Sequence, residues 1–180
     1  VTLLDQMSFG GAWTVALQPV QVGTTTENRI LLGGNGAGNF GSDSDFALIR
    51  LTPSGSIDTS FGPNANGFVR TNFCGRGDVV RAIAFDPSGN ILAGGEVEFD
   101  DYVSAFGIVR YSPNGVLDTS FGDPGSGSGQ PGKMMVSPLG PAASPIGGSA
   151  IPYSLVVQPD GKSILIGKAY DSLRHTRWGM

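Results

Sequence analysis

Two stretches of the chain, FALIRLTPSGSIDTSFG at residues 46–62 and FGIVRYSPNGVLDTSFG at residues 106–122, are near duplicates that lie 60 positions apart. Shorter matches flank them: RILLGG at 29–34 corresponds to NILAGG at 90–95, and KSILIG at 162–167 is a third copy. Self-similarity at a fixed period is the sequence signature of a repeat architecture. We therefore expect several copies of one structural unit.

Each unit is predicted to contain four short strands, because runs of apolar and β-branched residues alternate with turn signals. The turns DPSGN at 86–90 and QPDGK at 158–162 combine a proline that restricts φ with a glycine that allows positive φ. No stretch shows a sustained 3.6-residue apolar period, so no helix is expected. The predicted class is all-β.

The expected first strand of the three units lies at 1–4, 68–71 and 134–136, and the second at 15–17, 82–85 and 154–157. The third lies at 30–32, 91–93 and 164–166, and the fourth at 46–51, 106–111 and 178–180. The predicted single repeat domain spans 1–180, with units at about 1–62, 63–122 and 123–180. The last unit is truncated, and it carries an insertion rich in Gly, Ser and Pro at 123–150.

The pattern QPDGK–(S)IL–x–G, followed by F-x-x-x-R-[LY]-x-P-x-G-x-[IL]-D-T-S-F-G, resembles the delta-60 repeat, which occurs in tandem in large exported bacterial proteins. The resemblance covers nearly the whole chain, but the first unit lacks PDG and the third stops at Met180 before any DTSFG. It implies β-propeller-like blades. It implies no reaction, because the repeat is a scaffold and function has to be argued from a site.

Three units are an unusual number for a propeller, since propellers commonly have four to eight blades. Three blades alone would leave two open sheet edges, which tend to associate with other strands. We therefore expect either further repeats in a longer chain or a homodimer that shares closure, with Trp13 or Trp178 near the interface. Three units of four strands also match a β-trefoil-like closed fold, which is the alternative.

The amino-acid composition argues against some classes of binding partner. The chain has 180 residues with 11 Lys+Arg against 15 Asp+Glu, a balance that argues against a nucleic-acid partner. No apolar run reaches the roughly 18 residues of a membrane-spanning helix, so no membrane span is expected. The single cysteine, Cys74, excludes an internal disulfide. With only three lysines and many small polar residues, the composition fits an extracellular or cell-surface setting.

The DTSFG motif has an expected structural role. Asp58 and Asp118 can accept backbone N–H bonds from two residues ahead and form Asx turns. Phe61 and Phe121 would then fill the seam between neighbouring blades, while Gly62 and Gly122 release the chain into the next strand. The competing hypothesis makes the two aspartates metal ligands.

Variable loops on one rim of the repeated scaffold are the expected binding region, because such loops commonly carry function. The loops that follow the third strand of each unit (35–45, 96–104 and 168–177) share an acidic character. The candidate ligand-binding residues are Asp43, Asp45, Glu96, Tyr102, Asp171 and Trp178.

Clustered carboxylates on this rim suggest two chemistries. Ca²⁺ takes six to eight oxygen ligands, and its candidate ligands are Glu98, Asp100 and Asp101. Glycoside cleavage needs two carboxylates at a defined separation, and the catalytic candidates are Glu96, Glu98, Asp100 and Asp101. The alternative is that these side chains keep solvated loops soluble.

The predicted function is a non-enzymatic binding or scaffold module of an exported bacterial repeat protein, with ligand contacts on the acidic rim. No cofactor other than calcium is expected, and the expected partners are a second copy, further repeats or a glycan. The alternative is a carbohydrate-active hydrolase that uses the rim carboxylates.

Overall fold

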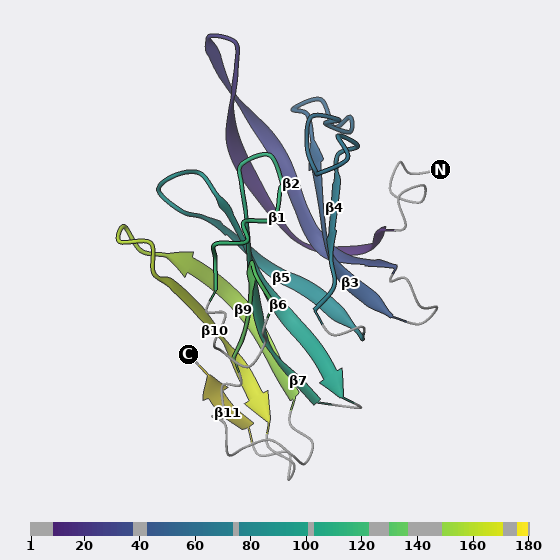
Figure 1. The fold of residues 1–180 in the computed structure, drawn as a ribbon, viewed down its shortest axis with the longest axis vertical. Helices are drawn as coiled ribbons and strands as arrows, with labels where there is room; N and C mark the ends of the chain where they lie inside the picture. Colours follow the sequence, from purple (N-terminus) through teal and green to yellow (C-terminus); the bar gives the residue numbers. More distant parts are fainter. Residues whose placement is uncertain are drawn as a thin grey trace.

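The computed structural model describes residues 9–37, 43–73, 76–100, 103–122, 130–136, 149–170 and 176–179, the backbone alone for 99–100 and 176–179. These ranges form eleven β-strands in three antiparallel sheets and contain no helix (Figure 1). The all-β prediction is confirmed. Within the same ranges, no helix has the length and hydropathy needed to cross a membrane.

Each sheet is a meander in which strands adjacent in sequence are adjacent in the sheet. The first sheet contains β1 (Phe9–Val22), β2 (Thr25–Ala37), β3 (Ser44–Leu51) and β4 (Phe68–Thr71). The second contains β5 (Asp78–Phe85), β6 (Ile91–Asp100), β7 (Val103–Tyr111) and β8 (Lys133–Val136). The described part of the third contains β9 (Ser149–Val157), β10 (Ser163–Tyr170) and β11 (Thr176–Gly179).

The second sheet lies between the other two, and the three do not close on themselves (Figure 1). One apolar cluster joins the first and second sheets and includes Leu48, Val80 and Val109. A second cluster joins the second and third sheets and includes Leu92 and Leu155. This open stack has the character of propeller blades rather than of the β-trefoil-like closed fold.

The last strand of each four-stranded sheet differs from its predicted place. Residues 68–71 and 134–136 were expected to open new units, but β4 pairs with β3 and β8 pairs with β7. The chain turns back after DTSFG through Gly67, whose φ is 82° and whose carbonyl accepts a bond from the Arg50 N–H. A repeat can be divided at any point of its period, so the sequence shows the period without showing where a sheet begins.

A β-bulge recurs on the first strand of every sheet and explains the repeated glycines of the second strand. The bulged residues are Trp13, Arg81 and Tyr153, opposite Gly34, Gly95 and Gly167. The extra residue forces the two backbones together, so a Cβ at Gly95 would lie only 2.0 Å from the carbonyl oxygen of Val79. Glycine is therefore required at this position of the GG motif.

Candidate functional site

Asp45, a predicted ligand residue, lies at the start of β3 with its carboxylate buried. Arg70 Nε lies 3.1 Å from one carboxylate oxygen, and Asn72 Nδ2 donates to the other at 2.8 Å. Both oxygens are thus already bonded within the first sheet. Asp43, two residues earlier, is partly exposed.

Glu96, on β6, takes part in a network between sheets. Its carboxylate lies 3.3 Å from Arg81 Nη2 on β5 and accepts a 3.2 Å bond from the Ser104 hydroxyl on β7. The Ser104 oxygen also accepts a 2.9 Å bond from the Ala150 N–H on β9. Glu96 therefore helps to hold the edge where the second and third sheets meet.

The remaining rim candidates are only partly within the described residues. Glu98 is partly buried, and a Cβ at Gly77 would lie 2.8 Å from its Oε2 atom. The side chains of Asp100 and Trp178 and the whole of Asp101, Tyr102 and Asp171 lie outside the described set. Among the residues that are described, no group of three or more His, Cys, Asp or Glu side chains could hold a metal ion.

Asp78 is a buried acid that sequence reasoning did not single out. Burial raises its pKa to about 7, and the neighbouring carboxylate of Asp45 adds to the rise. The Phe73 N–H, which donates to Asp78 at 2.9 Å, and the positive charge of Lys133 act in the opposite direction. The sequence signal is slight: a single acid precedes the apolar strand VVRAIAF.

The first DTSFG copy forms a compact turn around one carboxylate. Asp58 Oδ1 accepts bonds from the Ser60 N–H at 3.1 Å and from the Ser60 hydroxyl at 2.6 Å, which is an Asx turn. Its other oxygen lies 2.9 Å from Arg50 Nε. These bonds hold the pKa of Asp58 below its ordinary value against the opposing effect of burial.

Arg50 extends this turn into a buried link between the first two sheets. Its Nη1 atom donates to the carbonyl oxygen of Pro113 at 2.9 Å, and Gln18 donates to the same oxygen at 2.9 Å. The guanidinium stacks on the Phe61 ring at 4.6 Å, and that ring packs against Gly115. Phe61 therefore lies in the seam between the sheets, at the Pro-x-Gly turn of the second.

The second copy has the same internal bonds in a more open setting. Arg110 Nε donates to Asp118 at 2.8 Å, Asp118 accepts a 3.0 Å bond from the Ser120 N–H, and the guanidinium stacks on Phe121 at 4.9 Å. The Arg110 and Asp118 side chains are about one quarter exposed, whereas those of Arg50 and Asp58 are buried. Gly62 and Gly122 have φ of 87° and 90° and close the two turns.

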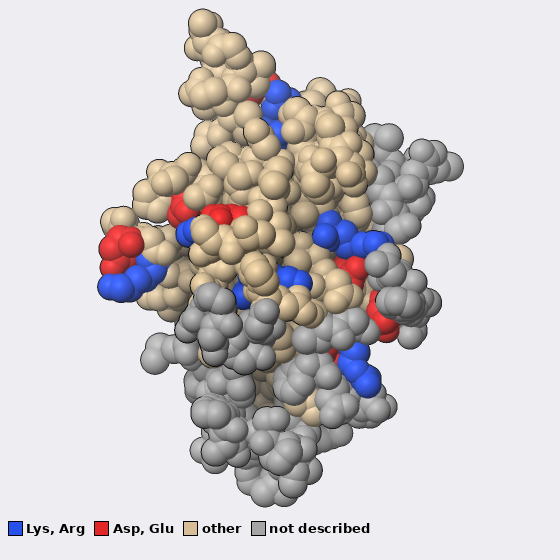
Figure 2. Space-filling model, viewed as in Figure 1, with Lys and Arg blue, Asp and Glu red and all other residues tan. Residues whose placement is uncertain are grey.

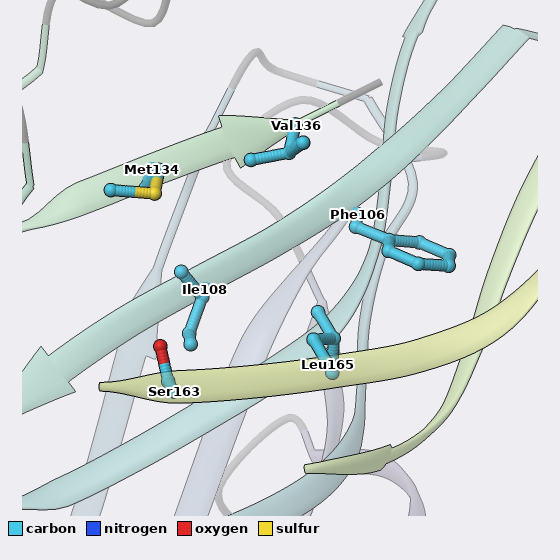
Figure 3. A pocket seen from close by; sticks show the side chains of 6 residues that line it. All are labelled: Phe106, Ile108, Met134, Val136, Ser163 and Leu165. Atoms are coloured by element: carbon cyan, nitrogen blue, oxygen red, sulfur yellow. The ribbon is translucent and has the colours of Figure 1, made fainter. Parts of the chain in front are cut away.

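An apolar cleft of about 160 Å³ lies between the second and third sheets. Figure 3 shows side chains from β7 and β8 on one side of it and from β10 on the other. Its lining residues are Phe106, Ile108, Met134, Val136, Ser163 and Leu165. This lining suits apolar side chains rather than a charged ligand.

A larger and more polar groove of about 360 Å³ runs between β4 and the turn that follows β7. Its lining includes Arg70, Lys133 and the exposed Val116. On the face shown in Figure 2, charged side chains form small groups within a mostly uncharged surface. Charge is therefore not concentrated into one patch on that face.

Two bulged aromatic residues are exposed on the first strands. The Trp13 ring stacks against the Arg81 guanidinium at 4.6 Å, and its Nε1 atom donates to Asn35 at 3.3 Å. Tyr153 occupies the same bulge on β9 and is also half exposed. Exposed aromatic rings of this kind can stack on ligands. The equivalent bulged residue of the second sheet is Arg81, so the aromatic residue is not repeated in all three sheets.

Comparison with known families agrees with the geometry. Two segments, residues 28–61 and 87–121, match a family model described as a β-propeller domain of unknown function, DUF5122. Each segment covers the second and third strands of a sheet and ends inside DTSFG. No curated protein matches the chain. These two segments are thus similar to a β-propeller-type family, which supports a β-propeller-like repeat for this part of the chain.

Proposed function

We propose that the protein is a non-enzymatic scaffold or binding module whose exposed sheet faces receive further sheets of the same kind. The observation that carries the proposal is the apolar outer face of the first sheet, where Val15 is 63 % exposed and Leu17 is 60 % exposed. Exposed apolar patches of this kind are typical of interaction surfaces.

Repeat equivalence indicates what would cover this face. The sequence TVALQP of β1 aligns with AIAFDP of β5 and the turn after it, so Val15 corresponds to Ile83 and Leu17 to Phe85. Ile83 and Phe85 pack into the cluster between the first and second sheets. Because an equivalent face is already covered by a sheet inside the molecule, another sheet of the same type is the occupant that fits.

The outer face of the third sheet supplies the matching surface. Val156, Ile164 and Ile166 are exposed there, and their equivalents on the second sheet face the third. The outer face of the first sheet and the outer face of the third sheet therefore correspond to the two sides of an interface between neighbouring sheets inside the molecule. The outer face of the first sheet in one copy can pack against the outer face of the third sheet in a second copy, which supports the proposed homodimer.

The further parts of the proposal rest on the sequence. The delta-60 resemblance and the low lysine content support an exported bacterial protein at the cell surface. Exposed Trp13 and Tyr153 support glycan contacts near the acidic rim.

Calcium at Glu98, Asp100 and Asp101 would raise the melting temperature in millimolar Ca²⁺, and Glu98→Gln would reduce that rise.

Self-association tests the scaffold proposal. Sedimentation equilibrium at micromolar concentration should show a dimer, and Leu17→Asp should weaken it at least about tenfold, since a charge at the interface centre lacks a partner. Val116→Asp is the matched control, because Val116 is 50 % exposed on a turn away from this face. A monomeric wild type, or equal effects of both substitutions, would reject the proposal.

A further inference from the structure

We infer that the junction of the first and second sheets carries a binding platform for a neutral, β-linked sugar chain, with the Trp13 ring as the surface on which one pyranose ring stacks. The inference rests on the glycan contacts of the proposed function and deepens them by naming a site and a class of sugar. It does not involve Val15 or Leu17, so the platform and the proposed dimer interface can be tested apart.

The β-bulge of β1 aims Trp13 at this junction, as bulges commonly re-aim a side chain. The indole Nε1 atom donates to Asn35 Oδ1 on β2 at 3.3 Å. The Arg81 guanidinium, from the neighbouring first strand β5, lies 4.6 Å from the ring centroid (Figure 1). Contacts with both sheets therefore hold the ring in place, which lowers the entropy cost of binding a ligand to it.

One face of the indole ring is open to solvent. Trp13 is 60 % exposed although Arg81 covers one face of its ring. Because cover on both faces would leave much less of the side chain exposed, the exposed area includes the opposite face. The apolar clusters formed by the described residues do not include Trp13. An ordered, exposed tryptophan outside the core is the type of residue that commonly anchors a ligand.

The charges around the ring favour a neutral ligand. The face of an aromatic ring is the negative part of its quadrupole, so it repels an anion. A cation on the open face would be repelled by Arg81, which already occupies the other face. The Glu96 carboxylate lies 3.3 Å from Arg81 Nη2 and balances its charge. The open face therefore suits a ligand without net charge.

Hydrogen-bonding groups border the ring. Within the described part of the chain, Arg81 makes one side-chain hydrogen bond, from Nη2 to Glu96, and its Nε atom has no partner. Asn35 accepts the indole N–H through its amide oxygen and has an amide nitrogen that can donate. A pyranose with equatorial hydroxyls has C–H bonds on its faces and hydroxyls at its edge. β-Linked glucose therefore matches an aromatic surface that is bordered by donors and by one carboxylate.

Two matched oligosaccharides test the platform on the intact protein. Cellohexaose is a neutral chain of β-linked glucose, and β-linked hexaglucuronate of the same length carries one carboxylate per ring. Titration calorimetry should show saturable binding of cellohexaose, at least about tenfold tighter than binding of hexaglucuronate. In a Trp178→Phe protein Trp13 is the only tryptophan, and its fluorescence should change to saturation over the same range of cellohexaose concentration.

Substitutions locate the platform. Trp13→Ala should weaken cellohexaose binding at least about tenfold. Tyr153→Ala is the matched control, because Tyr153 occupies the same bulge on β9 and is 51 % exposed, while no guanidinium among the described residues stacks on its ring. This control should change the affinity less than about twofold.

Arg81 is a positioning residue in this site. Arg81→Met should weaken cellohexaose binding severalfold, because the indole ring loses the group that holds it. Arg81→Lys keeps a cation against the ring and should restore most of the affinity.

The outcomes separate the platform from the scaffold proposal. No saturable binding of cellohexaose, or tighter binding of hexaglucuronate, would overturn the platform, and a dimeric protein with this result would leave the scaffold proposal standing. A monomeric protein that binds cellohexaose through Trp13 would overturn the scaffold proposal alone. Equal losses in Trp13→Ala and Tyr153→Ala would overturn the location of the platform, and equal affinities of Arg81→Met and Arg81→Lys would overturn the role of Arg81.

Discussion

At the scale of single residues, the same arginine, aspartate and phenylalanine occur twice in different surroundings. Arg50 is buried and bonds Asp58, Gln18 and the Pro113 carbonyl, so its loss leaves several buried groups without partners. Arg50→Met should lower the free energy of unfolding by about 3–5 kcal/mol, the usual cost of breaking a buried ion pair. Urea denaturation measures this loss.

Arg110 provides the matched comparison. Its ion pair with Asp118 is partly exposed, and exposed pairs contribute about 0–1 kcal/mol. Arg110→Met should therefore have a much smaller effect than the same change at Arg50. If the two substitutions cost the same, the inter-sheet bonds of Arg50 contribute no stability of their own.

Asp78 should make stability depend on pH in a direction opposite to that of the paired aspartates. Its folded pKa of about 7 lies above the ordinary value of 3.8, so the folded protein retains a proton that the unfolded chain has released. Its contribution to stability is full below about pH 4 and is lost as the pH rises through 7. Asp78→Asn keeps an oxygen for the Phe73 N–H and removes this loss.

The difference between wild type and Asp78→Asn isolates this one group. The variant should be more stable at pH 8 by up to about 4 kcal/mol, from roughly three pKa units at 1.36 kcal/mol each, and the gap should close towards pH 4. Denaturation at a series of pH values provides the measurement. A constant difference across the range would show that Asp78 titrates normally.

At the scale of strands and turns, the repeated glycines have unequal roles. A Cβ at Gly95 would lie 2.0 Å from the Val79 carbonyl oxygen, whereas a Cβ at Gly55 meets nothing within 4 Å. Gly95→Ala should cost about 3 kcal/mol or more, because the two backbones must separate. Gly55→Ala should cost about 1–2 kcal/mol, since only its φ of 85° is unfavourable for alanine. Thermal melts that rank the two variants in the reverse order would contradict the bulge explanation.

Features set by local sequence were the predictable ones. The paired β6 and β7 and the turn at 86–90 follow from apolar runs and from Pro and Gly, whose effects act within a few residues. The side-chain partners of Asp45 and the burial of Asp78 depend on residues that other strands bring alongside, so local patterns could not show them. The place of β4 was missed because a repeat period carries no mark of where a sheet ends.

At the scale of the whole molecule, the two interfaces between sheets are unequal. Among the residues that the structure describes, the cluster between the first and second sheets has more buried members than the cluster between the second and third. The Arg50 link also crosses the first of these interfaces. The larger apolar burial stabilises that interface more. The first two sheets should therefore behave as one cooperative unit, with the third joined to them through the smaller buried cluster.

Hydrogen exchange can resolve this difference strand by strand. Amides of β9 and β10 should exchange faster than those of β2 and β6, because elements with fewer buried contacts open more readily. Leu155→Ala removes a side chain from the second cluster and should speed exchange in β9 and β10 further, while leaving β2 and β3 unchanged. Val69→Ala, in the first cluster, should instead reduce protection across both the first and second sheets. Uniform protection of all three sheets, lowered equally by both substitutions, would mean that the stack unfolds as one body and that its third sheet has no separate stability.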